Sequence, residues 1–307
     1  MADAAQSRSG ERIGLGIASI IAAIFFFSVM DGIAKWLGQS HSAIQIAFFR
    51  NLFGLLPVAL IIWQGGGVAS LRTRRPWAHA LRAALIWLAL VTFFAAISLM
   101  PLAEAVAIAF AAPLFVTALS RPIVGEPVGP RRWAAVLVGF VGVLIIVRPG
   151  AEAFRPEALL VLLSALCFAL AMLVTRRMVR SETNAAILFY STVGGLIANG
   201  LLLPLFWSAP TADDLGLFFL LGLLGGVGSF LIVVAYRHAP AAVAAPFDYS
   251  ALLWSTLIGW LVWRDVPEPA VWLGAAVVVA SGLYIIHREA LRPRRLAVAP
   301  DQPSGPL

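Results

Sequence analysis

The sequence predicts an all-α integral membrane protein of ten transmembrane helices, arranged as two five-helix halves. Three observations predict this fold: the composition, the number of long apolar segments and an internal repeat. Of the 307 residues, 61% are hydrophobic and 12% are charged, whereas soluble domains are about 45–50% apolar and about 25% charged. A soluble globule could not bury so much apolar surface, so we expect lipid around the chain. This composition excludes a soluble enzyme, a disordered tail and a disulfide scaffold.

Ten segments are apolar enough to cross a membrane, and most approach the length of about 20 residues that a spanning helix needs. Their ranges are 13–37, 43–63, 78–99, 102–120, 132–147, 158–175, 185–207, 215–236, 242–262 and 270–287. The first segment is too long for the apolar core of a signal peptide and contains Asp31 and Lys35, so we interpret it as a retained helix. The polar stretches 1–12 and 289–307 are predicted to be cytoplasmic tails.

The positions of the basic residues predict the orientation of the chain. One of the 22 basic residues is a lysine, Lys35, and the others are arginines. With the N-terminus placed inside, 16 arginines fall in the inner tails and loops and 3 in the outer loops. Because cytoplasmic loops carry the excess of basic residues, we expect both termini in the cytoplasm. The charges do not form one patch, so no nucleic-acid partner is expected.

An internal repeat divides the chain into two halves, because residues 96–147 align with 235–286 without a gap at an offset of 139. The matched pairs are Pro101 with Pro240, Ala105 with Ala244, Leu114 with Leu253, Thr117 with Thr256, Glu126 with Asp265, and Trp133 with Trp272. Five helices per half is an odd number, so the second half enters the membrane inverted, as in alternating-access transporters. We expect a first repeat at 13–147, an outer linker at 148–157 and a second repeat at 158–288. The alternative is a duplication that only built a stable bundle.

Five charged residues lie within the apolar segments, namely Asp31, Lys35, Arg50, Glu104 and Asp248. One such charge at the bilayer centre costs about 2.5–3.5 kcal/mol, so we expect these side chains to face one another or a wet cavity. Asp31 and Lys35 are four residues apart on one helix face, which predicts that they pair. Arg50 is predicted to pair with Asp31 or Glu104 and to close an outer gate. Asp248 is a candidate for binding a cation or a proton. For all five, the alternative is a purely structural role.

Three aromatic residues near these charges, Phe110, Tyr249 and Trp254, are candidates for a surface on which a substrate stacks. The alternative is packing or interfacial anchoring, the commoner role of aromatic residues in membranes. Pro113 and Pro246 lie in the fourth and ninth segments, where each proline removes a hydrogen bond and permits a bend. The two prolines do not occupy matching positions in the repeat, so the sequence predicts unequal bends.

Four stretches of the chain carry a recognisable family pattern. SRPIVGEPVGPRRWAAVLVGFVGVLIIVRPG and VWRDVPEPAVWLGAAVVVASGLYIIHRE end the two halves, and LMPLAEAVAIAFAAPLF and HAPAAVAAPFDYSALLW precede them. Together they resemble the EamA-type carriers of the drug/metabolite transporter superfamily over about residues 13–290, which implies ten helices in two inverted repeats. Asp265 stands where such carriers usually have a glutamate. VMDGIAKWLGQ and IAFFRNLFGLLPV resemble the subgroup that includes S-adenosylmethionine and riboflavin carriers.

From these observations we expect a secondary transporter that moves a small organic metabolite by alternating access. Charges of both signs suggest a zwitterionic or amphiphilic substrate, such as an amino-acid-like compound or a cofactor similar to S-adenosylmethionine or riboflavin. Protons are a candidate coupling ion, and we expect a monomer or a homodimer. The alternatives are a passive facilitator and a membrane subunit that transports nothing. The sequence has no catalytic motif and no metal-ligand spacing, so we expect no enzyme activity, no metal and no cofactor.

The arginine distribution makes a prediction about topology. A cysteine placed at Asp213 should react with an impermeant thiol reagent added outside spheroplasts, whereas a cysteine at Thr73 should react only after the membrane is permeabilised. Both variants are made after the single native cysteine, Cys167, is replaced by serine. External labelling at Thr73 and none at Asp213 would invert the predicted orientation.

Overall fold

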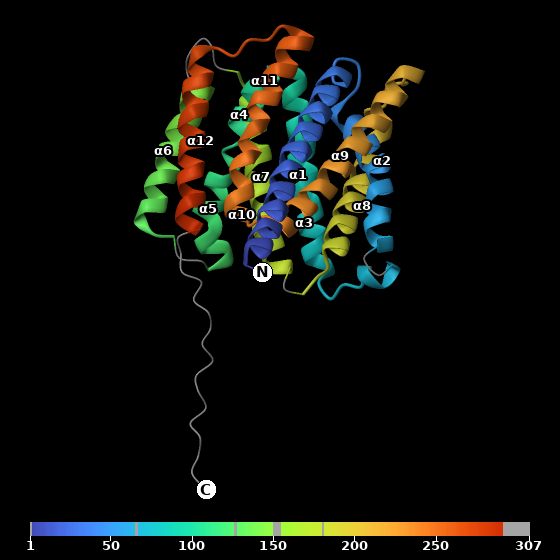
Figure 1. The fold of residues 1–307 in the computed structure, drawn as a ribbon. Coiled ribbons are helices and arrows are strands. Elements are labelled where there is room, and N and C mark those ends of the chain that lie inside the picture. Colours follow the sequence, from blue (N-terminus) through green and yellow to red (C-terminus); the bar gives the residue numbers. More distant parts are fainter. Residues whose placement is uncertain (1, 65–66, 126–127, 150–154, 180, 291–307) are drawn as a thin grey trace.

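The computed structural model describes residues 2–64, 67–125, 128–149, 155–179 and 181–290, which form a bundle of helices with no strand in these ranges (Figure 1). Its elements are α1 (Ala2–Leu37), α2 (Ala43–Gln64), η1 (Gly67–Leu71), α3 (Pro76–Leu99), α4 (Leu102–Ala109), α5 (Ala112–Val124), α6 (Pro130–Val147), α7 (Glu157–Met178), α8 (Asn184–Leu202), η2 (Leu203–Leu205), α9 (Ala212–His238), α10 (Ala241–Ala244), η3 (Ala245–Tyr249), α11 (Ser250–Trp263) and α12 (Pro269–Ala290). The matched acid Glu126, the linker residues 150–154 and the tail from 291 onward lie outside the described residues.

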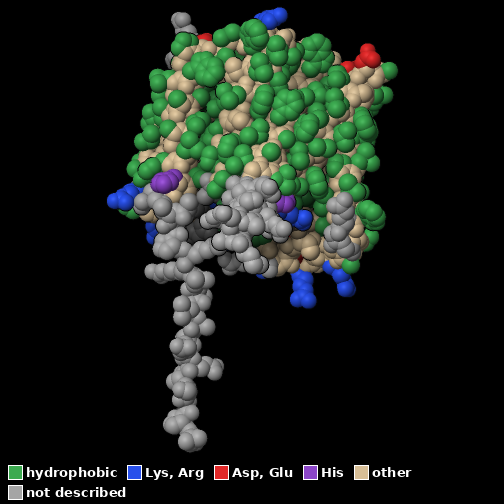
Figure 2. All heavy atoms as spheres, in the orientation of Figure 1, with side chains coloured by type: hydrophobic (Ala, Val, Ile, Leu, Met, Phe, Trp, Pro, Cys, Tyr) green, Lys and Arg blue, Asp and Glu red, His purple; other side chains and the backbone are tan. Residues whose placement is uncertain are grey.

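Nine helical spans in the described ranges are long and apolar enough to cross a membrane, with α4 and α5 counted as one span. They coincide with nine of the ten predicted segments, although α1 begins at Ala2 and so includes the predicted N-terminal tail. The predicted segment 242–262 is instead divided among α10, η3 and α11. Hydrophobic side chains cover the flank of the bundle (Figure 2), as expected of a surface that faces lipid. The predicted all-α, multi-pass membrane fold is confirmed.

The fourth and ninth predicted helices are both interrupted. Phe110 and Ala111 separate α4 from the start of α5, and Tyr249 ends η3 just before α11. Phe110 and Tyr249 are related by the 139-residue offset, and the two interruptions end within one residue of equivalent positions. The prolines differ, since Pro113 lies in the first turn of α5 and Pro246 in the first turn of η3. The sequence predicted unequal bends in these two helices. The interruptions do differ in length, because the one in the second half includes a 3₁₀ segment, but they end at nearly the same position in the repeat.

The helices pack in pairs that the repeat relates to each other. α1 packs on α9 as α7 packs on α3, and α1 packs on α11 as α7 packs on α5. α2 packs on its own equivalent α8, and α6 packs on its own equivalent α12. α1 begins and α12 ends at the same end of the bundle, which we name the lower end from its place in Figure 1, and the opposite end is the upper end. This arrangement is that of two inverted repeats.

The α6–α12 pair is held together by small residues. A Cβ atom added at Gly274 would lie 2.6 Å from the carbonyl oxygen of Gly142, and one added at Gly142 would lie 2.9 Å from that of Gly274. On the other side of the same interface, the hydroxyl of Ser281 donates to the carbonyl of Ala135 at 2.6 Å. The 139-residue offset converts one contact into the other, so the repeat axis passes between the two helices. Close backbone approach at small residues is a usual way to join helices in lipid.

Gly274→Ala is expected to separate α6 from α12, because a new methyl group would meet the Ile146 side chain at 2.5 Å and the backbone carbonyl of Gly142 at 2.6 Å, and the carbonyl cannot rotate away. The melting temperature of the purified protein in detergent should fall, and the yield of monodisperse protein with it. Gly216→Ala in α9 is the matched control, since an added Cβ there meets nothing within 4 Å, and alanine is the better helix former by about 1 kcal/mol. Equal melting temperatures for the two variants would contradict the proposed packing constraint.

Candidate functional site

Arg50 on α2 lies where α1, α2 and α9 meet. A Cβ atom at Gly225 of α9 would be 3.5 Å from Arg50 Nε, so this glycine makes room for the guanidinium. Arg50 Nη1 donates to Asn51 Oδ1 at 3.3 Å, and Arg50 Nε is buried without a hydrogen-bond partner among the described residues. Asp31 on α1 acts on Arg50 electrostatically, although no ion pair within 4.0 Å joins the two in the described part of the chain. Arg50 therefore keeps donor capacity for an additional anionic group.

Glu104 is not the partner of Arg50, which was the other pairing predicted for that arginine. It lies in the first turn of α4 at the upper end, where its Oε2 is 3.8 Å from Nε of Arg155 in the segment before α7. Of the two predicted partners of Arg50, Asp31 interacts with it, and Glu104 is paired elsewhere.

Lys35 does not pair with Asp31, and this prediction is wrong. Lys35 Nζ donates to the carbonyl oxygen of Met100 at 2.7 Å and lies 3.3 Å from Oδ2 of Asp265. It is also 5.0 Å from the ring centre of Trp263. The reason is that the lysine stem extends toward the upper end of α1, whereas Asp31 lies one turn deeper. The acid that meets it comes from the second repeat and is brought there by the tertiary fold.

Phe110 and Tyr249 contact each other, with ring centroids 4.7 Å apart and planes inclined by 38°. They are repeat equivalents, and residues that contact their own equivalents must lie close to the axis relating the two repeats. The Tyr249 hydroxyl extends to α12, where it packs against Gly282. The structure thus brings together two of the predicted aromatic residues, at the place where both broken helices resume.

The residues around Tyr249 include polar groups without partners. Asp248 in η3 acts electrostatically on the hydroxyls of Tyr236 and Tyr249, and within the described ranges no cation forms an ion pair with it. In the part of the chain that the structure describes, Ser250 Oγ and Trp254 Nε1 are buried without hydrogen-bond partners. The Trp254 ring packs edge-on against Phe25 of α1 at 5.1 Å. The stretch from η3 into α11 therefore offers one carboxylate and two unsatisfied donors.

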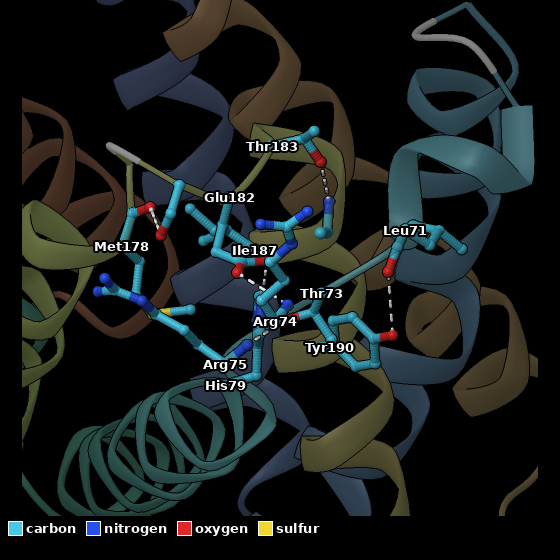
Figure 3. Close-up of polar contacts among 12 residues, drawn as sticks. Leu71, Thr73, Arg74, Arg75, His79, Met178, Glu182, Thr183, Ile187 and Tyr190 are labelled. Atoms are coloured by element: carbon cyan, nitrogen blue, oxygen red, sulfur yellow. Dashed lines mark hydrogen bonds and ion pairs between the residues drawn. The ribbon is translucent and has the colours of Figure 1, made fainter.

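A polar cluster at the lower end was missed from the sequence (Figure 3). His79 Nε2 on α3 lies 3.1 Å from Oε2 of Glu182, and Glu182 Oε1 accepts from the amide of Arg74 at 3.3 Å. The Thr183 hydroxyl donates to the carbonyl of Ser70 at 2.6 Å. These contacts join the α2–α3 connection to the α7–α8 connection. In the sequence these connections are two short polar loops about 100 residues apart, and no pattern indicates that they contact each other.

Glu182 is the electrostatic centre of this lower cluster. Burial acts to raise its pKa, but hydrogen bonds from His79, Thr73 and the Arg74 amide outweigh burial, so the pKa of Glu182 lies below its ordinary value. The carboxylate therefore stays ionised at neutral pH. Tyr190 completes the cluster, because its ring packs on His79 at 4.6 Å and its hydroxyl donates to a backbone carbonyl of η1 at 3.1 Å.

The upper end carries the repeat-related counterpart of this cluster. His41 Nε2 lies 3.2 Å from Oδ2 of Asp214, and the Ser42 hydroxyl donates to the carbonyl of Phe206 at 3.0 Å. Ser42 and Thr183 precede the equivalent helices α2 and α8, and each hydroxyl also accepts from the amide three residues on, at 3.2 and 3.0 Å. The same cap, the same loop-to-loop bond and a histidine–carboxylate pair thus occur at both ends.

Arg82 on α3 is a further intramembrane charge for which the sequence suggested no role. Its Nε donates to Thr175 Oγ1 of α7 at 2.7 Å, and its Nη1 donates to the carbonyl of Ile187 at 3.1 Å and to the hydroxyl of Ser191 on α8. Neutral acceptors on two neighbouring helices therefore hold this guanidinium and join α3 to both.

Comparisons with known proteins agree with this arrangement. The model of the EamA-like transporter family matches residues 14–148 and 155–287. The chain is 33% identical over 289 residues to the riboflavin transporter of Rhizobium johnstonii, covering 93% of this chain and 95% of the relative. It is 30% identical over 278 residues to the S-adenosylmethionine uptake transporter of Rickettsia bellii, covering 90% and 94%.

A third relative and a solved structure extend the comparison. The pseudopaline exporter of Pseudomonas aeruginosa is 30% identical over 277 residues, covering 88% of this chain and 93% of the relative. A solved crystal structure matches 90% of the chain with a TM-score of 0.62 at 20% identity, which supports the fold. The two family matches correspond to the two structural halves, and the chain belongs to the EamA-like transporter family.

Proposed function

We propose that this chain carries a small zwitterionic or amphiphilic metabolite across a bacterial inner membrane by alternating access, with both termini in the cytoplasm. The relatives are named as transporters of S-adenosylmethionine, riboflavin and pseudopaline. S-adenosylmethionine combines an amino-acid group with an aromatic base, and riboflavin contains a fused aromatic ring. A substrate similar to S-adenosylmethionine needs an aromatic surface and charged partners of both signs, and a substrate similar to riboflavin needs an aromatic surface.

The observation that carries the proposal is the contact of Phe110 with Tyr249 at the two helix interruptions. In inverted-repeat carriers the substrate site lies near the bilayer midplane at the repeat interface, where broken helices free backbone groups. Phe110, Tyr249 and Trp254 are proposed to stack on the aromatic or apolar part of the substrate. Asp248 is proposed to bind its cationic group or a coupling proton. Arg50, whose Nε lacks a partner, is proposed to bind its anionic group.

The remaining assignments follow from the same scheme. Asp31 is proposed to hold Arg50 between transport cycles, and Glu104 with Arg155 is proposed to line the upper entrance. The protein is proposed to act as a monomer or a homodimer, because one chain supplies both repeats. Transport is proposed to involve no enzymatic step. The rival is a passive facilitator, and counterflow separates the two, since preloaded internal substrate accelerates uptake only through a carrier that changes conformation.

Asp248→Asn is expected to abolish transport while leaving the protein folded, because the amide cannot hold a cation or release a proton. The measurement is counterflow of radiolabelled S-adenosylmethionine, riboflavin and amino acids in proteoliposomes, after a thermal-shift screen selects the probes that bind. Asp213→Asn at the exposed start of α9 is the matched control and should transport like the parent. Normal counterflow by Asp248→Asn at both acidic and neutral pH would remove Asp248 from the mechanism.

Arg50→Lys is expected to weaken apparent substrate affinity by about tenfold. Lysine keeps the positive charge but lacks the planar guanidinium, so it loses a charge-assisted hydrogen bond of about 1.5–3 kcal/mol.

Arg50→Met should also lower the melting temperature by leaving Asp31 without a cation, and adding Asp31→Asn should restore part of that loss. Transport kinetics and thermal unfolding are measured for both single variants and the double variant. If Arg50→Met keeps parental affinity, Arg50 binds no substrate; if the two substitutions are additive in stability, Asp31 is not its partner.

A further inference from the structure

The upper end of the bundle is closed by a contact between α1 and α3. Lys35 in the last turn of α1 donates to the carbonyl of Met100, the residue that caps the C-terminus of α3. Gly38, just beyond α1, packs against Ser98 of α3. α1 packs chiefly with α9 and α11, whereas α3 packs chiefly with α7 and α8. The Lys35 contact therefore joins a helix that packs mainly on α9 and α11 to a helix that packs mainly on α7 and α8.

An inverted repeat gives every such contact a counterpart at the other end of the molecule. When a carrier of this kind changes conformation, the two repeats exchange their arrangements, so a contact at one end is replaced by its counterpart at the other. A contact present at both ends in one structure survives the exchange. A contact present at one end only is broken and remade in each cycle.

The loop clusters belong to the first kind of contact. The bond from Ser42 to the carbonyl of Phe206 at the upper end has its counterpart in the bond from Thr183 to the carbonyl of Ser70 at the lower end. A histidine–carboxylate pair accompanies each of them. Because both ends hold this arrangement at once, it is part of the fixed scaffold, as are the self-paired helices α2–α8 and α6–α12.

The α1–α3 contact belongs to the second kind. Its counterpart would be packing of α7 on α9 at the lower end. Among the elements that the structure describes, α1 and α3 form a packed pair, whereas α7 and α9 share at most a marginal contact. The two ends of the bundle are therefore in different states, with the helices joined at the upper end and apart at the lower end.

We infer that Lys35 is the latch of the upper gate, and that this structure is the state in which the substrate site is closed to the upper end and faces the lower end. The inference rests on the proposed alternating access and adds a gating residue and a direction to it. The chemistry suits a reversible contact. The ammonium group meets the negative end of the α3 dipole, the Asp265 carboxylate and the Trp263 ring. When α1 leaves α3, the ammonium group exchanges the Met100 carbonyl for water, whereas Trp263 and Asp265 lie at the end of α11, which packs on α1.

Spin-label distances at the two ends test this inference without any substrate. After Cys167 is replaced by serine, one pair of labels is placed at Gln39 and Leu99 beside the upper contact, and a second pair at Val179 and Arg237 at the lower end; all four side chains are exposed. In nanodiscs, the upper pair of the parent should give a short, narrow distribution and the lower pair a longer one. Lys35→Met should raise the ratio of long to short upper distances by about tenfold, the effect of losing one charge-assisted bond, and shorten the lower pair. Lys35→Arg should preserve the parental distributions.

A matched control breaks a different ion pair at the same end. Glu268→Gln removes the 2.7 Å contact with Arg148, which joins the end of α6 to the segment before α12 within the fixed scaffold, and should leave both distributions unchanged. If Lys35→Met proves unstable, Asp265→Asn weakens the same latch and is measured instead. A monodisperse Lys35 or Asp265 variant with parental distances, or a parent whose two ends give equal distances, overturns the inference. If the distances respond to Lys35→Met but the protein transports none of the probe substrates in counterflow, the proposed function is wrong and the gate stands. If the protein shows counterflow but the distances do not respond, the gate is wrong and the proposed function stands.

Discussion

The absence of water from the hydrocarbon core is the constraint on which the rest of this structure depends. A polar group that finds no partner there costs several kcal/mol, so each intramembrane charge and each broken helix must be accommodated inside the bundle. Arg82 meets this constraint with neutral acceptors from α7 and α8. Lys35 meets it with a carbonyl, a carboxylate and an aromatic ring. Arg50 Nε and Trp254 Nε1 lack hydrogen-bond partners among the described residues, and for this reason both side chains are proposed to bind substrate.

Small residues are the second means by which the bundle is organised. Gly142 and Gly274 let α6 and α12 approach at the backbone, and Gly225 leaves space beside α2 for the guanidinium of Arg50. Hydrophobic burial gives little net attraction between helices in lipid, so close packing and hydrogen bonds decide which helices remain together. The packed pairs α2–α8 and α6–α12 lie on the repeat axis, and in the proposed gating they are the scaffold against which other helices move.

Inverted symmetry makes the two ends of the molecule comparable within one structure. The contacts at Ser42 and Thr183 match across the repeats, while the packing of α1 on α3 has no equally developed match at the lower end among the elements that the structure describes. The proposed site between the ends combines the axial pair Phe110 and Tyr249 with charges of opposite sign at Asp248 and Arg50. A stacking surface flanked by both charges is suited to a solute that is partly aromatic and partly zwitterionic.

The sequence by itself determined the membrane fold, the repeat offset and the family, because hydropathy and internal similarity are local or periodic properties of the chain. It also determined the number of membrane segments, except that the predicted segment 242–262 is divided among shorter helices. It also identified the residues that meet at the axis, Phe110 and Tyr249. Only the tertiary structure decided which charges pair. Lys35 lies one turn from Asp31 yet binds Asp265 of the other repeat, and Glu104 pairs with Arg155 instead of Arg50. The physical reason is that partner choice in a bundle depends on which helix ends converge, and that convergence is set by packing between segments far apart in sequence.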